Sequence, residues 1–327
     1  MFPPLEPFDT GMLEAGDGHR LYYEQCGNPD GLPVVFLHGG PGSGCSPQHR
    51  RLLDPDRFRA VLFDQRGCGR SQPRGALVAN TTQHLLADIE SLRAHLGIDR
   101  WLVMGGSWGS SLGVAYCAAH PERCLGALLR GIFLTGREDI DWFFRGAGAL
   151  APEAWATLAA GVEGVYGVEP ERLAAQVLSA VHAADAAVAA RAVRHWMAWE
   201  GALSAPGVAP LPLPAMDAEA MLAAIDKYRV QAHYLAHACF LGEEAVLGMA
   251  SQLGAMPVCI LHGRLDLVCR PVNAWRLHEV AGGSRLLFVD GAGHSPFDVP
   301  MSRAIIDALH GFHLHGDFRC IAPHENR

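Results

Sequence analysis

The order of element types along the chain constrains its fold more than any other feature of the sequence. Short apolar runs alternate with helical stretches over residues 1–134 and again after residue 255. Between them, residues 135–249 lack strand signals and are Ala-rich, with apolar residues at helical spacing. Alternating strands and helices predict a mostly parallel sheet with helices on both faces. We therefore expect one α/β domain, 1–134 and 250–327, interrupted by a helical cap domain at 135–249.

The individual elements follow from the same patterns. The expected strands are the apolar runs at 21–25, 33–37, 59–63, 101–104, 125–133, 256–261 and 285–289. The expected helices of the α/β part are 81–96, 108–119, 272–280 and 302–312. Within the helical stretch, the Pro-rich segment 205–214 predicts a loop.

Composition and charge exclude several classes of protein. The 327 residues are 50% hydrophobic, which is enough to bury one large core and too much for a disordered chain. The formal net charge is −8, so no basic excess attracts nucleic acid, and we expect no nucleic-acid partner. We expect no membrane partner, because no window of about 18 residues is both apolar and free of charge.

The cysteines and the N-terminus bear on the compartment. The nine cysteines are scattered, odd in number and without zinc-ligand spacing, which favours a reducing compartment over a disulfide framework. Residues 1–16 have no basic start followed by an apolar run, so no signal peptide is indicated. We expect a cytoplasmic protein with no metal and no organic cofactor. No feature of the sequence predicts an oligomeric state.

A candidate nucleophile stands between an expected strand and an expected helix. Gly105-Gly106-Ser107-Trp108-Gly109 follows the run 101–104 and opens the helix 108–119. Such a sharp turn forces its serine into strained backbone torsions, and small flanking glycines let strand and helix approach closely. The pattern Gly-x-Ser-x-Gly in this context is typical of the nucleophile elbow of α/β-hydrolases. We therefore expect Ser107 to be the nucleophile.

A serine hydroxyl needs a base, and the base needs a carboxylate that holds its tautomer. In this fold the order along the chain is Ser, acid, His. His294 follows the last expected strand on a Gly-rich turn and suits the base, and Asp266 follows the strand 256–261 and suits the acid. Asp290 is the competing acid, but it lies only four residues before His294 and is favoured as a turn residue.

The oxyanion formed during acyl transfer needs preorganised N–H donors. The segment His38-Gly39-Gly40-Pro41-Gly42 directly follows the expected strand 33–37, where this fold places part of its oxyanion hole. We expect the donors to be the backbone amides of Gly40 and Trp108.

Several segments, taken together in this order and spacing, resemble the proline iminopeptidases, which are α/β-hydrolase serine peptidases. The resemblance covers residues 21–312 and rests on PVVFLHGGPG at 33–42, FDQRGCGRS at 63–71, NTT at 80–82, GGSWGS at 105–110, LRGIF at 129–133, WMAWE at 196–200 and GRLDLVC at 263–269. It implies an aminopeptidase that removes N-terminal proline from peptides with a free amino terminus, through a triad of Ser107, Asp266 and His294.

The resemblance also implies how the substrate is bound. In the family, acidic residues of the cap bind the N-terminal ammonium and apolar side chains hold the pyrrolidine ring. Glu200 matches the first acidic position, with Trp196 one helical turn before it, and Phe133 is an expected wall of the pocket. A carboxylate that pairs with an ammonium enforces exopeptidase action, because an internal peptide bond offers no charge there.

Three positions depart from the family pattern. The segment that typically reads Ala-Arg-Ile-Glu-Asn-His-Tyr-Phe is YRVQAHYL at 228–235, so Gln231 replaces a second glutamate and Leu235 an aromatic residue. Phe144 stands where the family often has tyrosine. Losing one charge-assisted contact costs roughly 1–3 kcal/mol of binding. The sequence leaves open whether Glu243 or Glu244 compensates for Gln231.

Cys269 matches a cysteine that the family carries near its active site, and we expect bulky thiol reagents to inhibit there by steric blockade. Two alternatives to the aminopeptidase remain. One is an esterase or amidase of the same fold, favoured by Gln231 and Leu235, and the other is a non-catalytic ligand receptor, disfavoured because all triad positions occur together. A haloalkane or epoxide hydrolase would need Asp in place of Ser107.

Overall fold

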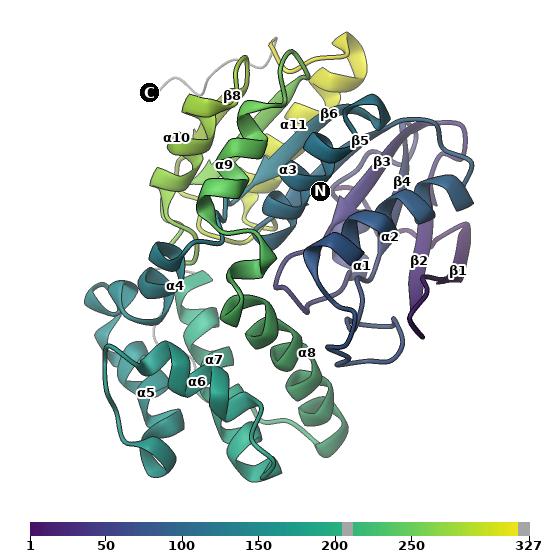
Figure 1. Ribbon diagram of the computed structural model, residues 1–327. Coiled ribbons are helices and arrows are strands. Elements are labelled where there is room, and N and C mark those ends of the chain that lie inside the picture. The colour runs from purple at the N-terminus through teal and green to yellow at the C-terminus, as the bar shows by residue number, and fades with distance from the viewer. Residues whose placement is uncertain (205–211, 320–327) are drawn as a thin grey trace.

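The computed structural model describes residues 1–204 and 212–319 and is built on one eight-stranded sheet. The strands are β1 (Asp9–Glu14), β2 (Arg20–Gly27), β3 (Leu32–Leu37), β4 (Phe58–Phe63), β5 (Trp101–Gly106), β6 (Cys124–Arg130), β7 (Val258–Gly263) and β8 (Arg285–Val289). Their order is β1-β2-β4-β3-β5-β6-β7-β8, and every pair from β4 to β8 is parallel (Figure 1). The expected α/β-hydrolase fold, with its mostly parallel sheet, is confirmed.

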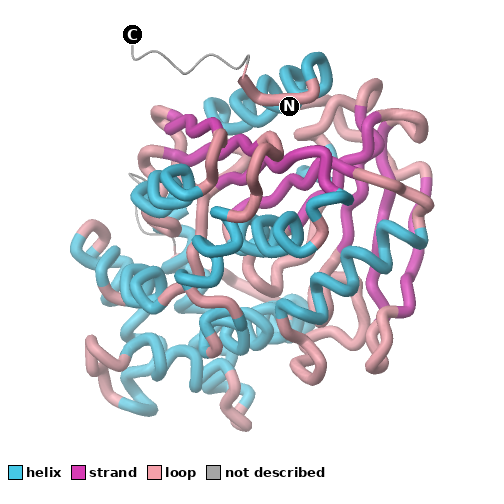
Figure 2. The backbone as a smooth tube through the Cα atoms, turned by 45° about the horizontal axis from the view of Figure 1, so that its top comes forward, coloured by secondary structure: helices cyan, strands magenta, loops and turns pink. Residues whose placement is uncertain are grey.

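Helices cover both faces of this sheet (Figure 2). Those that belong to it are α1 (Pro47–Arg50), α2 (Thr82–His95), α3 (Trp108–Ala119), η1 (Pro121–Arg123), α9 (Glu243–Ser251), α10 (Pro271–Val280) and α11 (Val299–His315). Alternating side chains of β3 divide between two cores: Val35 and Leu37 pack on the α2 and α3 side, and Val34 and Phe36 on the α11 side. The central strands are therefore buried on both faces, as a parallel sheet requires.

Two expected elements differ from the structure. The run 125–133 ends as a strand at Arg130, because Gly131 turns the backbone to φ +56° while the chain beyond it stays buried. Strand β1 is absent from the sequence-based set and pairs antiparallel with β2. Its third residue is Gly11, where a Cβ would lie 2.5 Å from the Tyr23 hydroxyl, so the position that packs on Tyr23 has no side chain to signal a strand.

The cap consists of α4 (Arg137–Phe144), η2 (Gly146–Ala149), α5 (Pro152–Tyr166), α6 (Leu173–Val181), α7 (Ala186–Ser204) and α8 (Ala218–Ala236), and it leaves through η3 (Ala238–Phe240). In Figure 1 these helices lie together at one end of the sheet. Helix α9 packs instead on α3 and α10, which favours a cap that ends before Glu243. The division at 135 and 249 stays a proposal.

Two further expectations concern the Pro-rich loop of the cap and the absence of a membrane-spanning segment. Residues 205–211 of the expected loop 205–214 lie outside the described residues, and 212–214 have no regular structure. No helix within 1–204 or 212–319 is both long and apolar enough to cross a bilayer.

Candidate active site

Ser107 lies at a sharp turn between β5 and α3, with φ 56° and ψ −126°. The turn brings strand and helix so close that a Cβ on Gly105 would lie 2.1 Å from the Gly109 carbonyl oxygen, and a Cβ on Gly109 2.0 Å from that of Leu37. Only glycine fits at either position. The Ser107 amide donates to the Arg130 carbonyl at 2.9 Å, which ties the turn to the neighbouring strand β6. The side chain remains half-buried at the edge of a cavity.

Asp266 and His294 form a hydrogen-bonded pair, with 2.8 Å between Asp266 Oδ2 and His294 Nδ1. The other carboxylate oxygen accepts the amides of Val268 and Cys269 at 3.0 and 2.8 Å. Burial alone would raise the pKa of Asp266, but His294, His262 and the hydrogen bond from the Cys269 amide together outweigh it, so this pKa lies below its usual range. An ionised carboxylate can only accept, so Nδ1–H of His294 is the donor in this hydrogen bond.

The competing acid Asp290 has a different partner. It forms an ion pair with Arg264 at 2.7 Å, and both side chains are about half exposed. The backbone of His294 is held by Arg130, whose buried guanidinium donates to the His294 carbonyl oxygen. The structure therefore joins Asp266, and not Asp290, to His294.

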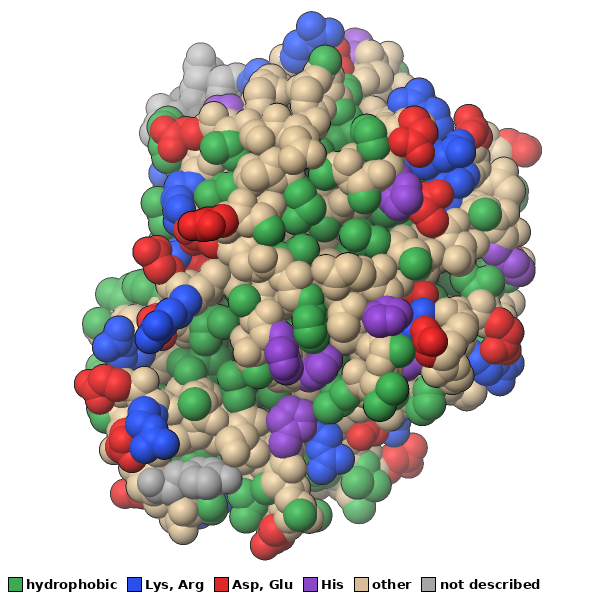
Figure 3. Space-filling view, in the orientation of Figure 1, with side chains coloured by type: hydrophobic (Ala, Val, Ile, Leu, Met, Phe, Trp, Pro, Cys, Tyr) green, Lys and Arg blue, Asp and Glu red, His purple; other side chains and the backbone are tan. Residues whose placement is uncertain are grey.

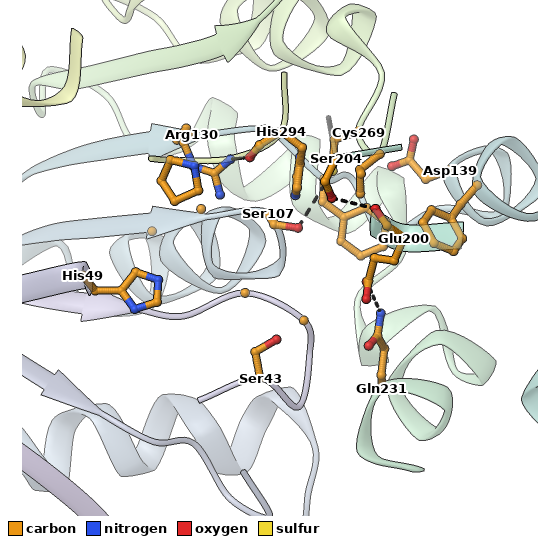
Figure 4. Close-up of a pocket in the computed structure, with 18 of the residues that line it drawn as sticks. Ser43, His49, Ser107, Arg130, Asp139, Glu200, Ser204, Gln231, Cys269 and His294 are labelled. Carbon is orange, nitrogen blue, oxygen red and sulfur yellow. Dashed lines mark hydrogen bonds between the residues drawn. The ribbon is translucent and has the colours of Figure 1, made fainter. Parts of the chain in front are cut away.

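Ser107 and His294 line the same cavity (Figure 4). Among the described residues, Ser107 Oγ makes no hydrogen bond to His294, and its polar contact is the Cys269 sulfur at 4.0 Å. Catalytic hydrogen bonds are often long in ligand-free structures and tighten when substrate binds. Cys269 is buried, and burial raises the pKa of its thiol well above the usual value.

The two backbone amides expected to bind an oxyanion have no protein acceptor in the described structure. Within the described residues, neither the Gly40 nor the Trp108 amide donates to a protein acceptor. Gly40 has φ +113°, which a side chain would resist. The side chain of Trp108 is buried, and its indole N–H donates to the Gln65 side-chain oxygen at 2.9 Å. The amides expected from the sequence are thus free to receive a ligand oxygen.

His38, which the sequence-based prediction left without a role, shapes this loop. Its Nε2 accepts the Gln65 amide at 3.0 Å, and its Nδ1 lies 2.9 Å from the Gly39 carbonyl oxygen and 3.2 Å from the Gly44 amide nitrogen. Burial lowers the pKa of His38, so the ring stays neutral. The two ring nitrogens together connect the segment 39–44 to the backbone at Gln65.

A cavity of about 280 Å³ separates Ser107 and His294 from the cap. The loops after β3, β5, β7 and β8 line one side of it, and α4, α7 and α8 line the other. All five residues predicted to bind substrate border this cavity: Phe133, Phe144, Glu200, Gln231 and Leu235. Asp266 does not, because it lies behind His294, and Trp196 lies behind Phe144 and Tyr228.

Glu200, the cap carboxylate expected to bind the substrate's ammonium, already has three polar neighbours. Tyr228 donates its hydroxyl to Oε2 at 2.5 Å, and Gln231 donates its side-chain amide to Oε1 at 3.1 Å (Figure 4 draws the Gln231 contact). The Lys227 ammonium lies 3.9 Å from Oε2. Burial and the charge of Glu200 raise the pKa of Tyr228, which therefore remains a donor. Gln231 Oε1 is buried without a hydrogen-bond partner in the described structure.

Neither Glu243 nor Glu244 compensates for Gln231. Glu243 pairs with Arg276 at 2.6 Å, Glu244 is exposed, and neither borders the cavity. The other carboxylate that does is Asp139, which is already bonded to the Leu134 amide and to Asn273 and Arg270. Glu200 is thus the cavity carboxylate whose hydrogen bonds come only from cap side chains.

Helix α4 of the cap is held to the loop that carries Asp266 by two hydrogen bonds. Trp142 of α4 donates its indole N–H to the Leu267 carbonyl at 2.9 Å. Arg270, at the end of the same loop, binds Asp139 of α4 at 2.9 Å. The aromatic residues of α4 that border the cavity therefore have a fixed position relative to Asp266.

A second buried histidine, His262, contacts the loop 264–270 that carries Asp266, and it was not identified from the sequence. Its Nδ1 accepts the Ile132 amide at 3.1 Å, and its Nε2 lies 3.0 Å from the Cys269 carbonyl and 3.6 Å from Asp266 Oδ2. Burial lowers the pKa of His262, so the ring is neutral. Its place four residues before Asp266 was the available signal, but a lone histidine in a chain with 17 carries little information.

A serine at a strand-to-helix elbow, an Asp–His pair on the loops after β7 and β8, and a helical cap over them define an α/β hydrolase. The sequence profile of the alpha/beta hydrolase fold family matches residues 33–300. The proline iminopeptidase of Xylella fastidiosa is 43% identical over 324 residues, covering 95% of this chain and 99% of that protein. The proline iminopeptidase of Arabidopsis thaliana is 39% identical, covering 94% and 80%. The chain therefore belongs to the proline iminopeptidase family.

Solved structures agree on the fold. VinJ superposes with a TM-score of 0.68 at 20% identity, covering 94% of this chain and 99% of that one. The proline iminopeptidase of Mycobacterium smegmatis gives a TM-score of 0.63 at 19% identity, covering 94% and 100%. At this level of identity the likeness extends to the fold alone.

Proposed function

We propose that this chain is a serine aminopeptidase that releases N-terminal proline from peptides through an acyl-enzyme at Ser107. The observation that carries the proposal is the Asp266–His294 hydrogen bond of 2.8 Å at a cavity bordered on one side by Ser107 and on the other by Glu200. The family relationship of the chain supports the same activity.

The chemical steps follow from the positions of these groups. His294 Nε2 takes the Ser107 proton as Oγ attacks the prolyl carbonyl carbon, and Asp266 stabilises the imidazolium. The resulting oxyanion is received by the amides of Gly40 and Trp108. Collapse breaks the C–N bond as His294 donates its proton to the departing amine. Water then attacks the acyl-enzyme with His294 again as base, which releases proline and restores the serine hydroxyl.

Substrate selection is assigned to the cap. Glu200 offers a negative charge to the N-terminal ammonium, and the partnerless Gln231 Oε1 offers a second acceptor. A secondary ammonium has two N–H donors, which matches one charged and one neutral acceptor. Phe133, Phe144 and Leu235 border the same cavity and supply apolar surface for a pyrrolidine ring.

An esterase or amidase of the same fold is the second candidate. It is favoured by the surroundings of Glu200, whose charge is opposed by Lys227 and whose second partner, Gln231, is neutral. Such a cap admits an uncharged acyl group at lower electrostatic cost than a cap with two carboxylates.

The deciding experiment compares hydrolysis of prolyl, alanyl and leucyl arylamides with that of a short-chain aryl ester, and repeats the prolyl assay with the amine blocked. We expect the free prolyl arylamide to be preferred, Ser107→Ala to lower kcat by at least about 10⁴-fold, and Glu200→Gln to raise KM for the free amine alone. Ester cleavage without any arylamide cleavage would establish the esterase. No hydrolysis of any substrate would favour the non-catalytic receptor.

The remaining proposals concern surroundings and partners. We place the enzyme in the cytoplasm with peptides as its substrates, and the eight described cysteines, all free, support a reducing compartment. On the face in Figure 3, Lys and Arg side chains are interspersed with Asp and Glu, which argues against a nucleic-acid surface there. No cluster of three His, Cys, Asp or Glu in the described ranges is arranged to hold a metal, and the proposed hydrolysis uses none.

A further inference from the structure

Lys227 is the only lysine in the 327 residues, since the other 25 of the 26 basic positions hold arginine. This single lysine borders the catalytic cavity. Its ammonium lies 3.9 Å from Glu200 Oε2 and 4.8 Å from the centre of the Tyr228 ring. Of the described carboxylates, Glu200 is the one with which Lys227 forms an ion pair.

The backbone of Lys227 is fixed, whereas its side chain has room to move. A Cβ on Gly42 would lie 2.3 Å from the Lys227 carbonyl oxygen, so this turn of α8 packs tightly against the oxyanion loop. The lysine side chain is 33% exposed, and its long stem reaches from this anchored turn toward Glu200. Motion of the ammonium away from Glu200 therefore requires rotation of side-chain bonds alone.

Lysine and arginine differ at such a position. The planar guanidinium of arginine forms two parallel hydrogen bonds to a carboxylate, whereas the lysine ammonium is a compact charge on a flexible stem. An arginine at 227 would bind Glu200 in a bidentate pair and block it. A lysine ammonium has the same charge as the amino terminus of a peptide, so the two compete for Glu200 and the substrate's ammonium can displace the lysine.

We propose that Lys227 is a specificity-determining residue, a tethered counter-ion that neutralises Glu200 in the free enzyme and is displaced by the substrate's ammonium. The inference rests on the aminopeptidase activity proposed above. An uncharged acyl group cannot displace Lys227, so for such substrates the Glu200–Lys227 pair stays closed and the cavity stays neutral. Lys227 thereby sets the balance between free-amine and uncharged substrates.

The test compares Lys227→Met with a matched control, Arg74→Met. Arg74 forms an ion pair at 3.2 Å with Asp226, the residue before Lys227 on α8, but Arg74 does not border the cavity. We expect Lys227→Met to lower KM for the prolyl arylamide about two- to fivefold with kcat within about twofold, the range for a partly exposed ion pair. KM for the aryl ester should rise, and Lys227→Arg should raise KM for the arylamide. Arg74→Met should change neither.

Two further measurements secure the interpretation. In a Glu200→Gln background, Lys227→Met should no longer affect KM for the arylamide. In Ser107→Ala protein, saturating prolyl arylamide should increase acetylation of Lys227 by acetic anhydride relative to the protein's own N-terminal amine, as read by peptide mass. The single lysine makes this labelling unambiguous, and this readout does not depend on the folding of a Lys227 variant.

Each outcome decides between the two proposals. Wild-type protein without arylamide activity would overturn the proposed function and this inference with it. Wild-type activity with KM unchanged or raised in Lys227→Met, or with Lys227 labelling unchanged or lowered by substrate, would overturn the inference alone.

Discussion

The turn through which the chain leaves the cap predicts a mutation that stabilises the protein. Ala238, Cys239 and Phe240 have φ values of 48°, 53° and 56°, so three consecutive non-glycine residues adopt left-handed backbone conformations. The turn is held by its surroundings: Thr82 Oγ1 donates to the Cys239 carbonyl at 2.5 Å, and the Gly242 amide to that of Ala238 at 2.9 Å. Such strain persists only where neighbouring contacts impose it.

The magnitude follows from the cost of this conformation. A left-handed residue with a Cβ costs about 1–2 kcal/mol, which glycine avoids. Against this, glycine gives the unfolded chain additional freedom worth about 0.4–1 kcal/mol. Ala238 is half-buried, so removing one methyl group loses little packing. We expect Ala238→Gly to raise the free energy of unfolding by about 0.5–1 kcal/mol.

The assay is urea unfolding followed by both tryptophan fluorescence and far-UV circular dichroism. The control is Ala223→Gly, the same chemical change at a half-buried position inside the right-handed helix α8. There glycine should lower the free energy of unfolding by about 0.5–1 kcal/mol. The two substitutions therefore have opposite expected signs. If Ala238→Gly destabilises as Ala223→Gly does, the turn is not strained and the reasoning fails.

Two further predictions concern acid stability and thiol chemistry. Burial lowers the pKa of His49 to about 4, so between about pH 6.5 and 4 the unfolded chain binds a proton that the folded chain does not. The free energy of unfolding should therefore fall by up to about 3 kcal/mol on this account as the pH is lowered from 6.5 toward 4. Urea unfolding at pH 7 and 4.5 should show a smaller loss in His49→Phe, and equal losses would contradict this. Burial raises the pKa of the Cys269 thiol well above its usual value, so inactivation by a bulky maleimide should accelerate about tenfold per pH unit from 7 to 9. The inactivation should be absent in Cys269→Ser. Unchanged sensitivity of that variant would exclude steric blockade at Cys269.

The sequence predicted the parts of the fold that local patterns encode. Buried parallel strands such as β3 and β5 are short apolar runs, and they were found where expected. Strand β1 was not predicted, because its pairing with β2 and not its own composition makes this segment a strand. The end of β6 was misplaced because the chain after Gly131 remains apolar under the cap, so hydrophobicity continues where the hydrogen-bond ladder stops.

The candidate site divides in the same way. Ser107, Asp266 and His294 could be proposed because each follows a strand, and the ends of parallel strands meet at one edge of the sheet. Their catalytic roles remain predictions. The neighbours of Glu200 could not be predicted, because the pairing of α7 with α8 depends on the packing of the cap and not on spacing along either helix. Supporting groups such as His262 were missed for the same reason.

The contacts between α4 and the acid loop have a consequence for protein engineering. Trp142 and Arg270 join a helix of the cap to the loop that carries Asp266, so this part of the cap is not an independent module. A chimaera that takes its cap from a relative would have to take the loop 264–270 as well, or reproduce both contacts, to keep the acid in place. Substitutions confined to α5 and α6, which do not border the cavity, are free of that requirement. Those two helices are therefore the places to vary first when the cap is redesigned.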